Sequence, residues 1–172
     1  MNFHNLALPS DEERYEELLK LSLDYARQGE TKALCMMLEH GLPVTLSNAQ
    51  GNSLLMLAAY HDHPETVQML LERGAEPDKT NDRGQTSLAG VAFKGYLHVA
   101  KLLLSAGADP LIPQGMGMTP LSFAMLFGRT EVQQLMEQHL ALSETKKMPF
   151  LLHCMRKLQK LFQKKNRKLK PH

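Results

Sequence analysis

The sequence GQTSLAGVAFKGYLHVAKLLLSAGADP, residues 84–110, recurs in altered form on both of its sides along the chain. It follows GNSLLMLAAYHDHPETVQMLLERGAEP at 51–77 and precedes GMTPLSFAMLFGRTEVQQLMEQHLAL at 117–142, so each unit starts 33 residues after the last. An earlier stretch, YARQGETKALCMMLEHGLPV at 25–44, matches the second half of the same unit. A fixed period of this length predicts a repeat architecture, in which each unit buries its apolar face only by stacking on its neighbours.

The first part of each unit predicts a short helix. A hydroxyl-bearing residue stands before each apolar run, where its oxygen can accept a hydrogen bond from a free amide of the first turn: Ser53, Thr86 and Thr119. The helices themselves are expected over residues 55–60, 88–93 and 121–126.

The second part of each unit predicts a second helix. Residues that favour a break separate the two helices: Asp62, Gly95 and Gly128. Apolar residues then recur at helical spacing, as in Val99, Leu102 and Leu103. Gly74 and Gly107 follow, where a helix commonly ends in a left-handed residue. Leu140 takes that place in the last unit, so we expect its second helix either to run on or to end differently.

Several short motifs make the 33-residue repeat pattern more specific. They are Gly117-Met118-Thr119-Pro120-Leu121, Leu57-Ala58-Ala59, Glu131-Val132, and Leu102-Leu103-Leu104 with Gly107-Ala108-Asp109. With these motifs in phase, the sequence resembles the ankyrin repeat family and is similar to its short bacterial stand-alone members. The resemblance implies an all-α solenoid of stacked helix-turn-helix units with short hairpin loops. The family's TPLH motif reads SLLM, TSLA and TPLS here, and the absent His, which ties neighbouring turns, predicts weaker coupling between repeats.

The expected domain organisation has three parts. An acidic lead-in at 1–19 precedes an ankyrin repeat domain at 20–142, and a basic amphipathic tail follows at 143–172. Within the domain, the repeats are expected at about 20–48, 49–81, 82–114 and 115–142. Residues 1–142 carry 10 Lys and Arg against 17 Asp and Glu, a net charge of −7, whereas residues 143–172 carry 10 against one acid, a net charge of +9.

The tail predicts a C-terminal amphipathic helix after Pro149. Its basic face comprises Arg156, Lys157, Lys160, Lys164 and Arg167. Several roles stay open for this helix: capping the last repeat, folding over the acidic array, inserting into another protein's groove, binding an anionic membrane surface, or binding nucleic acid.

Other function classes find little support in the sequence. No apolar run is long enough to span a bilayer, and no secretory signal is expected, so we predict a cytoplasmic protein. No phosphate loop, GxSxG or HExxH motif occurs, which predicts a non-enzyme without a cofactor or metal. We expect His61-Asp62-His63 to form a polar turn rather than a metal site, and Cys35 to act as a small buried hydrophobic residue.

The resemblance implies a protein–protein interaction module that binds on its concave side. The residues expected there are Arg83, Gln85, Met116 and Met118 at hairpin tips, and Tyr60, His61, Phe93, Lys94, Leu126 and Phe127 at the exposed ends of the first helices. Tyr60, Phe93 and Leu126 are one repeat apart and should stack into an apolar stripe, unless the rings pack beneath their own hairpins or are covered by the terminal segments. We therefore predict a monomer that binds a partner protein and inhibits or regulates it. The alternative is a membrane or nucleic-acid tether that acts through the tail, with the repeats as adaptor.

Overall fold

The computed structural model of the protein describes residues 10–114 and 117–143. The chain divides into two compact units, Met1–Leu135 and Met136–His172. The helices of the first unit are α1 (Asp11–Gln28), α2 (Thr31–Glu39), α3 (Leu54–Tyr60), α4 (Pro64–Glu72), α5 (Ser87–Lys94), α6 (Leu97–Ser105) and α7 (Pro120–Leu126). Residues 130–143 are helical as well, so of the two expected outcomes the last helix continues through Leu140.

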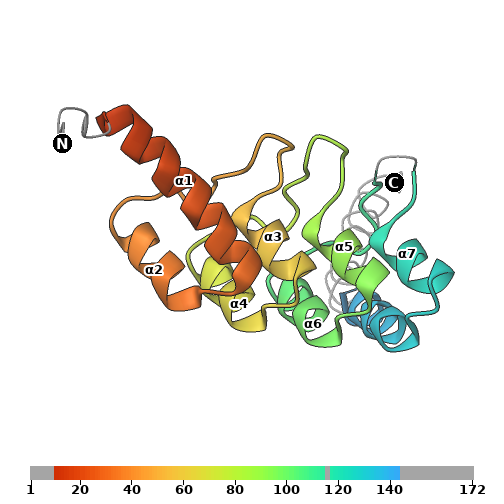
Figure 1. The fold of residues 1–172 in the computed structure, drawn as a ribbon. Helices are drawn as coiled ribbons and strands as arrows, with labels where there is room; N and C mark the ends of the chain where they lie inside the picture. Colours follow the sequence, from red (N-terminus) through yellow and green to blue (C-terminus); the bar gives the residue numbers. More distant parts are fainter. Residues whose placement is uncertain (1–9, 115–116, 144–172) are drawn as a thin grey trace, which may run out of the picture. The chain divides into compact units, whose positions relative to one another are not determined.

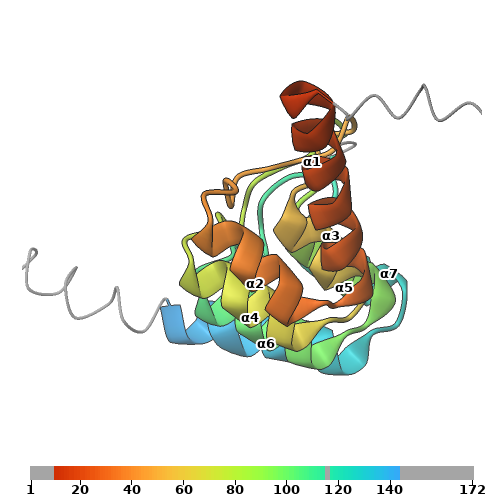
Figure 2. The same ribbon diagram turned by 60° about the vertical axis from the view of Figure 1, so that its left-hand side comes forward.

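The helices of the first unit form two rows. In one row α1, α3, α5 and α7 pack against one another in succession, and in the other α2, α4 and α6 do the same (Figures 1 and 2). Successive helices α1 and α2, α3 and α4, and α5 and α6 also pack as pairs. The arrangement confirms the expected all-α solenoid of stacked helix pairs.

The predicted helix ends are confirmed. The hydroxyl oxygens of Ser53, Thr86 and Thr119 accept hydrogen bonds from the N–H of the residue three positions on, and so cap α3, α5 and α7. The turns between paired helices place Asp62, Gly95 and Gly128 in the left-handed region, with φ of 60°, 87° and 63°. Gly74 and Gly107 end the second helices with φ of 86° and 96°.

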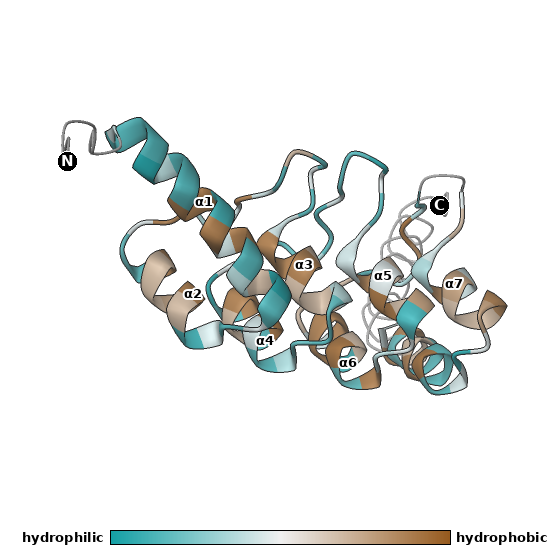
Figure 3. Ribbon diagram, viewed as in Figure 1, coloured by the Kyte–Doolittle hydropathy of each residue, from teal (hydrophilic) through white to brown (hydrophobic). Residues whose placement is uncertain are grey.

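The first helix starts earlier than the repeat pattern suggested. A capping box at Ser10 and Glu13 begins α1, so the expected boundary at residue 19 falls inside a single helix. The N-terminal half of α1 is hydrophilic (Figure 3), and Tyr15 and Leu18 on it are 55% and 48% exposed.

The core is built from residues that recur once per repeat. Leu34 and Val67 on the second helices are fully buried, and Ala100 occupies the same position in the next repeat. Leu55 and Leu88 hold one repeat position on the first helices, and both are buried. Burying a Leu or Val side chain contributes about 1.5–3 kcal/mol. The array is thus stabilised mainly by contacts between neighbouring repeats.

Polar groups also link neighbouring repeats in the absence of the family's usual His. His63 Nε2 lies 2.7 Å from the carbonyl oxygen of Arg27, and two repeats on, Arg129 Nε donates to the carbonyl of Phe93 at 3.0 Å. Gln114, which is buried, accepts a 2.7 Å hydrogen bond from the N–H of Thr86. The weaker coupling expected from the missing His stays a prediction.

The expectation for Cys35 is wrong. The residue is half-buried, and its Sγ accepts a 2.9 Å hydrogen bond from Arg73. Arg73 is the C-cap residue of α4 and also pairs with Glu39 at 2.7 Å. This contact holds the pKa of the Glu39 carboxyl below its usual value, chiefly through the hydrogen bond from Arg73. A polar neighbour that is distant in sequence therefore overrides the apolar role that the local helix pattern suggested.

Candidate functional site

The same backbone hydrogen bond closes the hairpins that precede α3, α5 and α7. In each, a glycine N–H donates to a carbonyl three residues earlier, from Gly51 to Asn48, Gly84 to Asn81 and Gly117 to Gln114, at 2.8–2.9 Å. The three glycines have φ of 70–75°, which favours glycine at these turns.

Side-chain hydrogen bonds stiffen the middle hairpin and join it to the one before. Asn81 Oδ1 accepts from the N–H groups of Arg83 and Gln85, both at 3.0 Å. Asn81 Nδ2 donates to Asn52 of the preceding hairpin at 2.9 Å, and the N–H of Asp82 donates to the carbonyl of Gln50 at 3.2 Å. The tips therefore form one connected polar edge.

Aromatic rings lie at the far ends of the first helices. Tyr60, Phe93 and Phe127 are 43%, 39% and 42% exposed, so the rings are not packed away beneath their hairpins. Phe93 meets Phe127 edge-on with ring centroids 4.6 Å apart, and Phe127 stacks with Phe123 at 6.3 Å. The Lys94 ammonium lies 4.7 Å from the centre of the Tyr60 ring, within range of a cation–π interaction.

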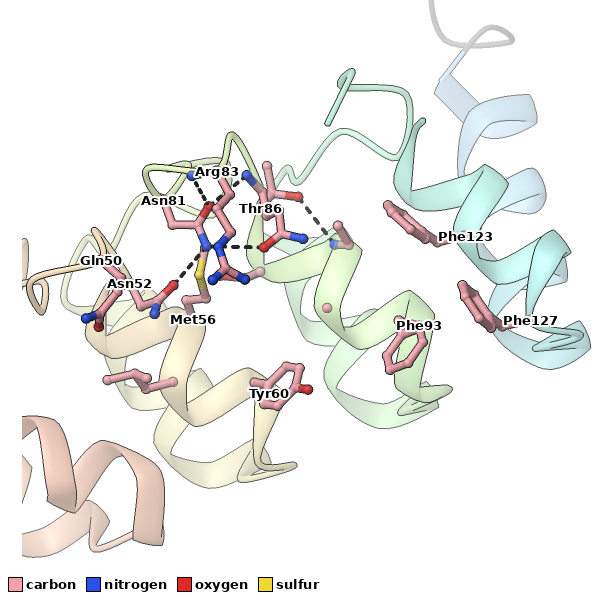
Figure 4. Close-up of a pocket in the computed structure, with 15 residues that line it drawn as sticks. Gln50, Asn52, Met56, Tyr60, Asn81, Arg83, Thr86, Phe93, Phe123 and Phe127 are labelled. Carbon is pink, nitrogen blue, oxygen red and sulfur yellow. Dashed lines mark hydrogen bonds between the residues drawn. The ribbon is translucent and has the colours of Figure 1, made fainter. Parts of the chain in front are cut away.

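A groove of about 500 Å³ lies between the hairpin edge and these rings (Figure 4). Residues from three repeats line it: Gln50, Asn52, Met56, Leu57, Tyr60, Asn81, Arg83, Gln85, Thr86, Ser87, Ala89, Gly90, Phe93, Phe123 and Phe127. Its hairpin side is polar and its helix side is largely apolar, the combination that favours a specific protein or peptide ligand.

Gly90 makes the hollow in the middle of the groove. Leu57 and Phe123 hold the same repeat position on either side, and all three residues line the groove. A Cβ at Gly90 would lie 3.2 Å from the Tyr60 ring. A glycine between two large residues at one repeat position is the sequence signal for this groove.

The predicted binding residues divide into three groups. Tyr60, Arg83, Gln85, Phe93 and Phe127 line the groove, whereas His61, Lys94, Met118 and Leu126 do not, and Met116 lies outside the described residues. Leu126 has the repeat spacing of Tyr60 and Phe93 but is replaced in the lining by Phe127, the next residue, and by Phe123, one turn earlier. Sequence reasoning missed Met56, Gly90 and Phe123.

His61 lies beside Tyr60 at the helix end of the groove but does not line it. Partial burial lowers the pKa of His61, and the positive charges of His63, Arg27 and Lys94 lower it further. His61 is thereby biased toward its neutral form. The Asp62 beside it occupies the left-handed turn, and His63 bonds to Arg27, so these residues serve the turn between α3 and α4.

Residues 10–114 and 117–143 hold no group of three or more His, Cys, Asp or Glu arranged to bind a metal ion. No helix in this part of the chain is long and apolar enough to cross a membrane. The predicted basic face, Arg156, Lys157, Lys160, Lys164 and Arg167, lies outside the described residues.

Comparisons with known proteins agree with the repeat geometry. A Pseudomonas aeruginosa protein named "Putative ankyrin repeat protein PA3287" is 47% identical over 53 residues, an alignment that spans 31% of this chain and 31% of that protein. The family described as ankyrin repeats (3 copies) matches residues 23–114, more than half of the chain. Ankyrin repeats are in general non-catalytic modules for protein–protein interaction. With its phased helix pairs and hairpins, this chain belongs to the ankyrin repeat family.

Proposed function

We propose that the chain binds a partner protein in the groove between its hairpins and the ends of α3, α5 and α7, and that this binding inhibits or regulates the partner. The observation that carries the proposal is one continuous groove lined by three half-exposed rings, those of Tyr60, Phe93 and Phe127. Exposed apolar surface of this kind, bordered by polar residues, is typical of interaction sites.

The rings would supply most of the binding energy. Tyrosine and other large aromatic residues at the centre of an interface commonly contribute about 2 kcal/mol or more each when a partner covers them. The polar edge formed by residues such as Gln50, Asn52 and Gln85 would set the orientation of the partner.

The rigidity of the groove favours tight binding. Hydrogen bonds between Asn81 and Asn52 and between Gln114 and Thr86 hold the hairpins and helices in place before a partner arrives. A preformed surface loses less conformational entropy on binding than a flexible one.

We propose that the protein is cytoplasmic. Cys35 is a free thiol, which suits a reducing compartment.

A pull-down from a lysate of the source organism tests the proposal. The full chain, the groove variant Tyr60→Ala/Phe93→Ala and the control Tyr15→Ala/Leu18→Ala are immobilised, and retained proteins are quantified at low and high salt. The control removes an aromatic and an apolar side chain of similar exposure on α1, outside the groove. We expect a protein that the full chain and the control retain at high salt and that the groove variant loses.

Two results would contradict the proposal. One is equal retention of every captured protein by the groove variant. The other is a partner that the groove variant keeps but that high salt, or Lys157→Glu/Lys160→Glu/Lys164→Glu in the full chain, releases. The second result would favour the tether that acts through the basic tail.

A further inference from the structure

Formal charge in the groove lining is confined to one position. Of its lining residues, all within the described part of the chain, Arg83 alone carries a formal charge. Arg83 is exposed, and among the described residues its guanidinium makes neither an ion pair nor a hydrogen bond. The neighbouring acid, Asp82, turns toward the preceding hairpin, where its Oδ1 would lie 2.5 Å from a Cβ at Gly51.

A second cation lies beside the lining. Lys94 follows Phe93 at the helix end and reaches the face of the Tyr60 ring, 4.7 Å from its centre. Arg83 lies on the hairpin side of the groove, and the rings of Tyr60 and Phe93 lie on its helix side (Figure 4). Lys94 adds a second cation beside the lining, at the Tyr60 ring.

These charges restrict which ligands can bind in the groove. An anionic group on the ligand could accept two parallel hydrogen bonds from the planar guanidinium of Arg83. A ligand with a basic residue at that place would desolvate two like charges, which is unfavourable. A nucleic acid would need several cations along its phosphates, and this lining supplies one.

The apolar part of the groove restricts the ligand further. Tyr60, Phe93 and Phe127 gain stability from burial only if the ligand brings an apolar side chain against them. The side-chain amides of Gln50 and Gln85 at the opposite edge can both donate and accept, as a peptide backbone requires.

We infer that the groove takes a peptide segment in which an apolar side chain covers the rings and an adjacent Asp or Glu pairs with Arg83. This inference rests on the proposed function and specifies the chemistry of the partner. The juxtaposition of the Arg83 guanidinium, which has no partner among the described residues, with a cluster of half-exposed rings carries it.

Selection from a random library of displayed 12-residue peptides tests the inference without a known partner. The full chain is the target, and peptides that also bind Tyr60→Ala/Phe93→Ala are removed. The remaining peptides should be enriched in Asp or Glu within two positions of an aromatic or aliphatic residue.

One enriched peptide is then measured against charge variants of the full chain. Arg83→Glu should weaken its binding at least tenfold, and replacing the acidic residue of the peptide by Lys should restore binding to Arg83→Glu. Lys101→Glu is the matched control, since it makes the same change of charge at an exposed site on α6 outside the groove, and should leave binding unchanged.

The outcomes separate this inference from the proposed function. Groove-dependent peptides without acidic enrichment, or equal binding by Arg83→Glu and Lys101→Glu, would overturn the inference and leave the groove as a binding site. A selection in which every peptide binds Tyr60→Ala/Phe93→Ala as well, or in which none binds the full chain, would contradict both.

Discussion

Replacing Gly29 by Ala should destabilise the array through a contact between two repeats. Gly29 has φ of 75°, and a Cβ there would lie 2.5 Å from Nδ1 of His63. The His63 ring is held by the contact of its Nε2 with the Arg27 carbonyl at 2.7 Å. The new methyl group must therefore displace the ring and break this link between the first and second repeats.

Gly128→Ala provides the matched control. Gly128 holds the same repeat position with φ of 63°, and nothing lies within 4 Å of a Cβ built on it. Both variants place an alanine in the left-handed region, at a cost of about 1–2 kcal/mol. Gly29→Ala also loses the His63 hydrogen bond, about 0.5–1.5 kcal/mol, so its total cost should exceed that of the control by about 1 kcal/mol.

Urea denaturation of the full chain, followed by circular dichroism, measures this difference from the midpoints at a shared m-value. The double variant Gly29→Ala/His63→Ala should cost less than the sum of its single variants, because the truncated residue no longer blocks the methyl group. Equal costs for Gly29→Ala and Gly128→Ala, together with additivity in the double variant, would refute the reasoning.

Three further changes have defined outcomes. Gln114→Ala leaves the buried N–H of Thr86 without its 2.7 Å partner and should cost about 1–3 kcal/mol in urea unfolding. Gln50→Ala at an exposed hairpin tip should cost about 0.5 kcal/mol or less, and similar costs for the two variants would argue against the link between Gln114 and Thr86. Gly90→Ala should stabilise α5 by about 0.5–1 kcal/mol because the half-exposed Tyr60 ring can shift, and destabilisation would show that it cannot. Since folding lowers the pKa of His61, the folded state binds fewer protons there than the unfolded state, and the free energy of unfolding should fall as the pH drops below about 6.5. This effect should be absent in His61→Gln, and equal pH profiles of stability for both proteins would contradict it.

Local chemistry made most of the fold predictable. Hydroxyl caps such as Thr86 and glycines such as Gly107 act through nearby backbone groups, so their roles follow from their positions in the repeat. The early start of α1 was also encoded locally, in the capping box of Ser10 and Glu13, but it falls outside the period of the repeat and was missed.

The candidate site was less predictable because its lining comes from side chains of three neighbouring repeats. The repeat spacing placed Tyr60 and Phe93 in one stripe, and both line the groove. The same spacing predicted Leu126, but Phe127 lines the groove instead, and successive side chains point about 100° apart around a helix. The link from Arg73 to Cys35 likewise joins residues 38 positions apart and has no local signal.

The affinity of a captured partner for the groove variant tests the central claim most directly. Isothermal titration would compare the full chain with Tyr60→Ala/Phe93→Ala and with Tyr15→Ala/Leu18→Ala, each checked for an unchanged helical spectrum. The groove variant should bind at least about 30-fold more weakly, the loss expected for a single residue worth about 2 kcal/mol, and the control should bind like the full chain. Unchanged affinity in the groove variant would contradict the claim that these rings bind the partner.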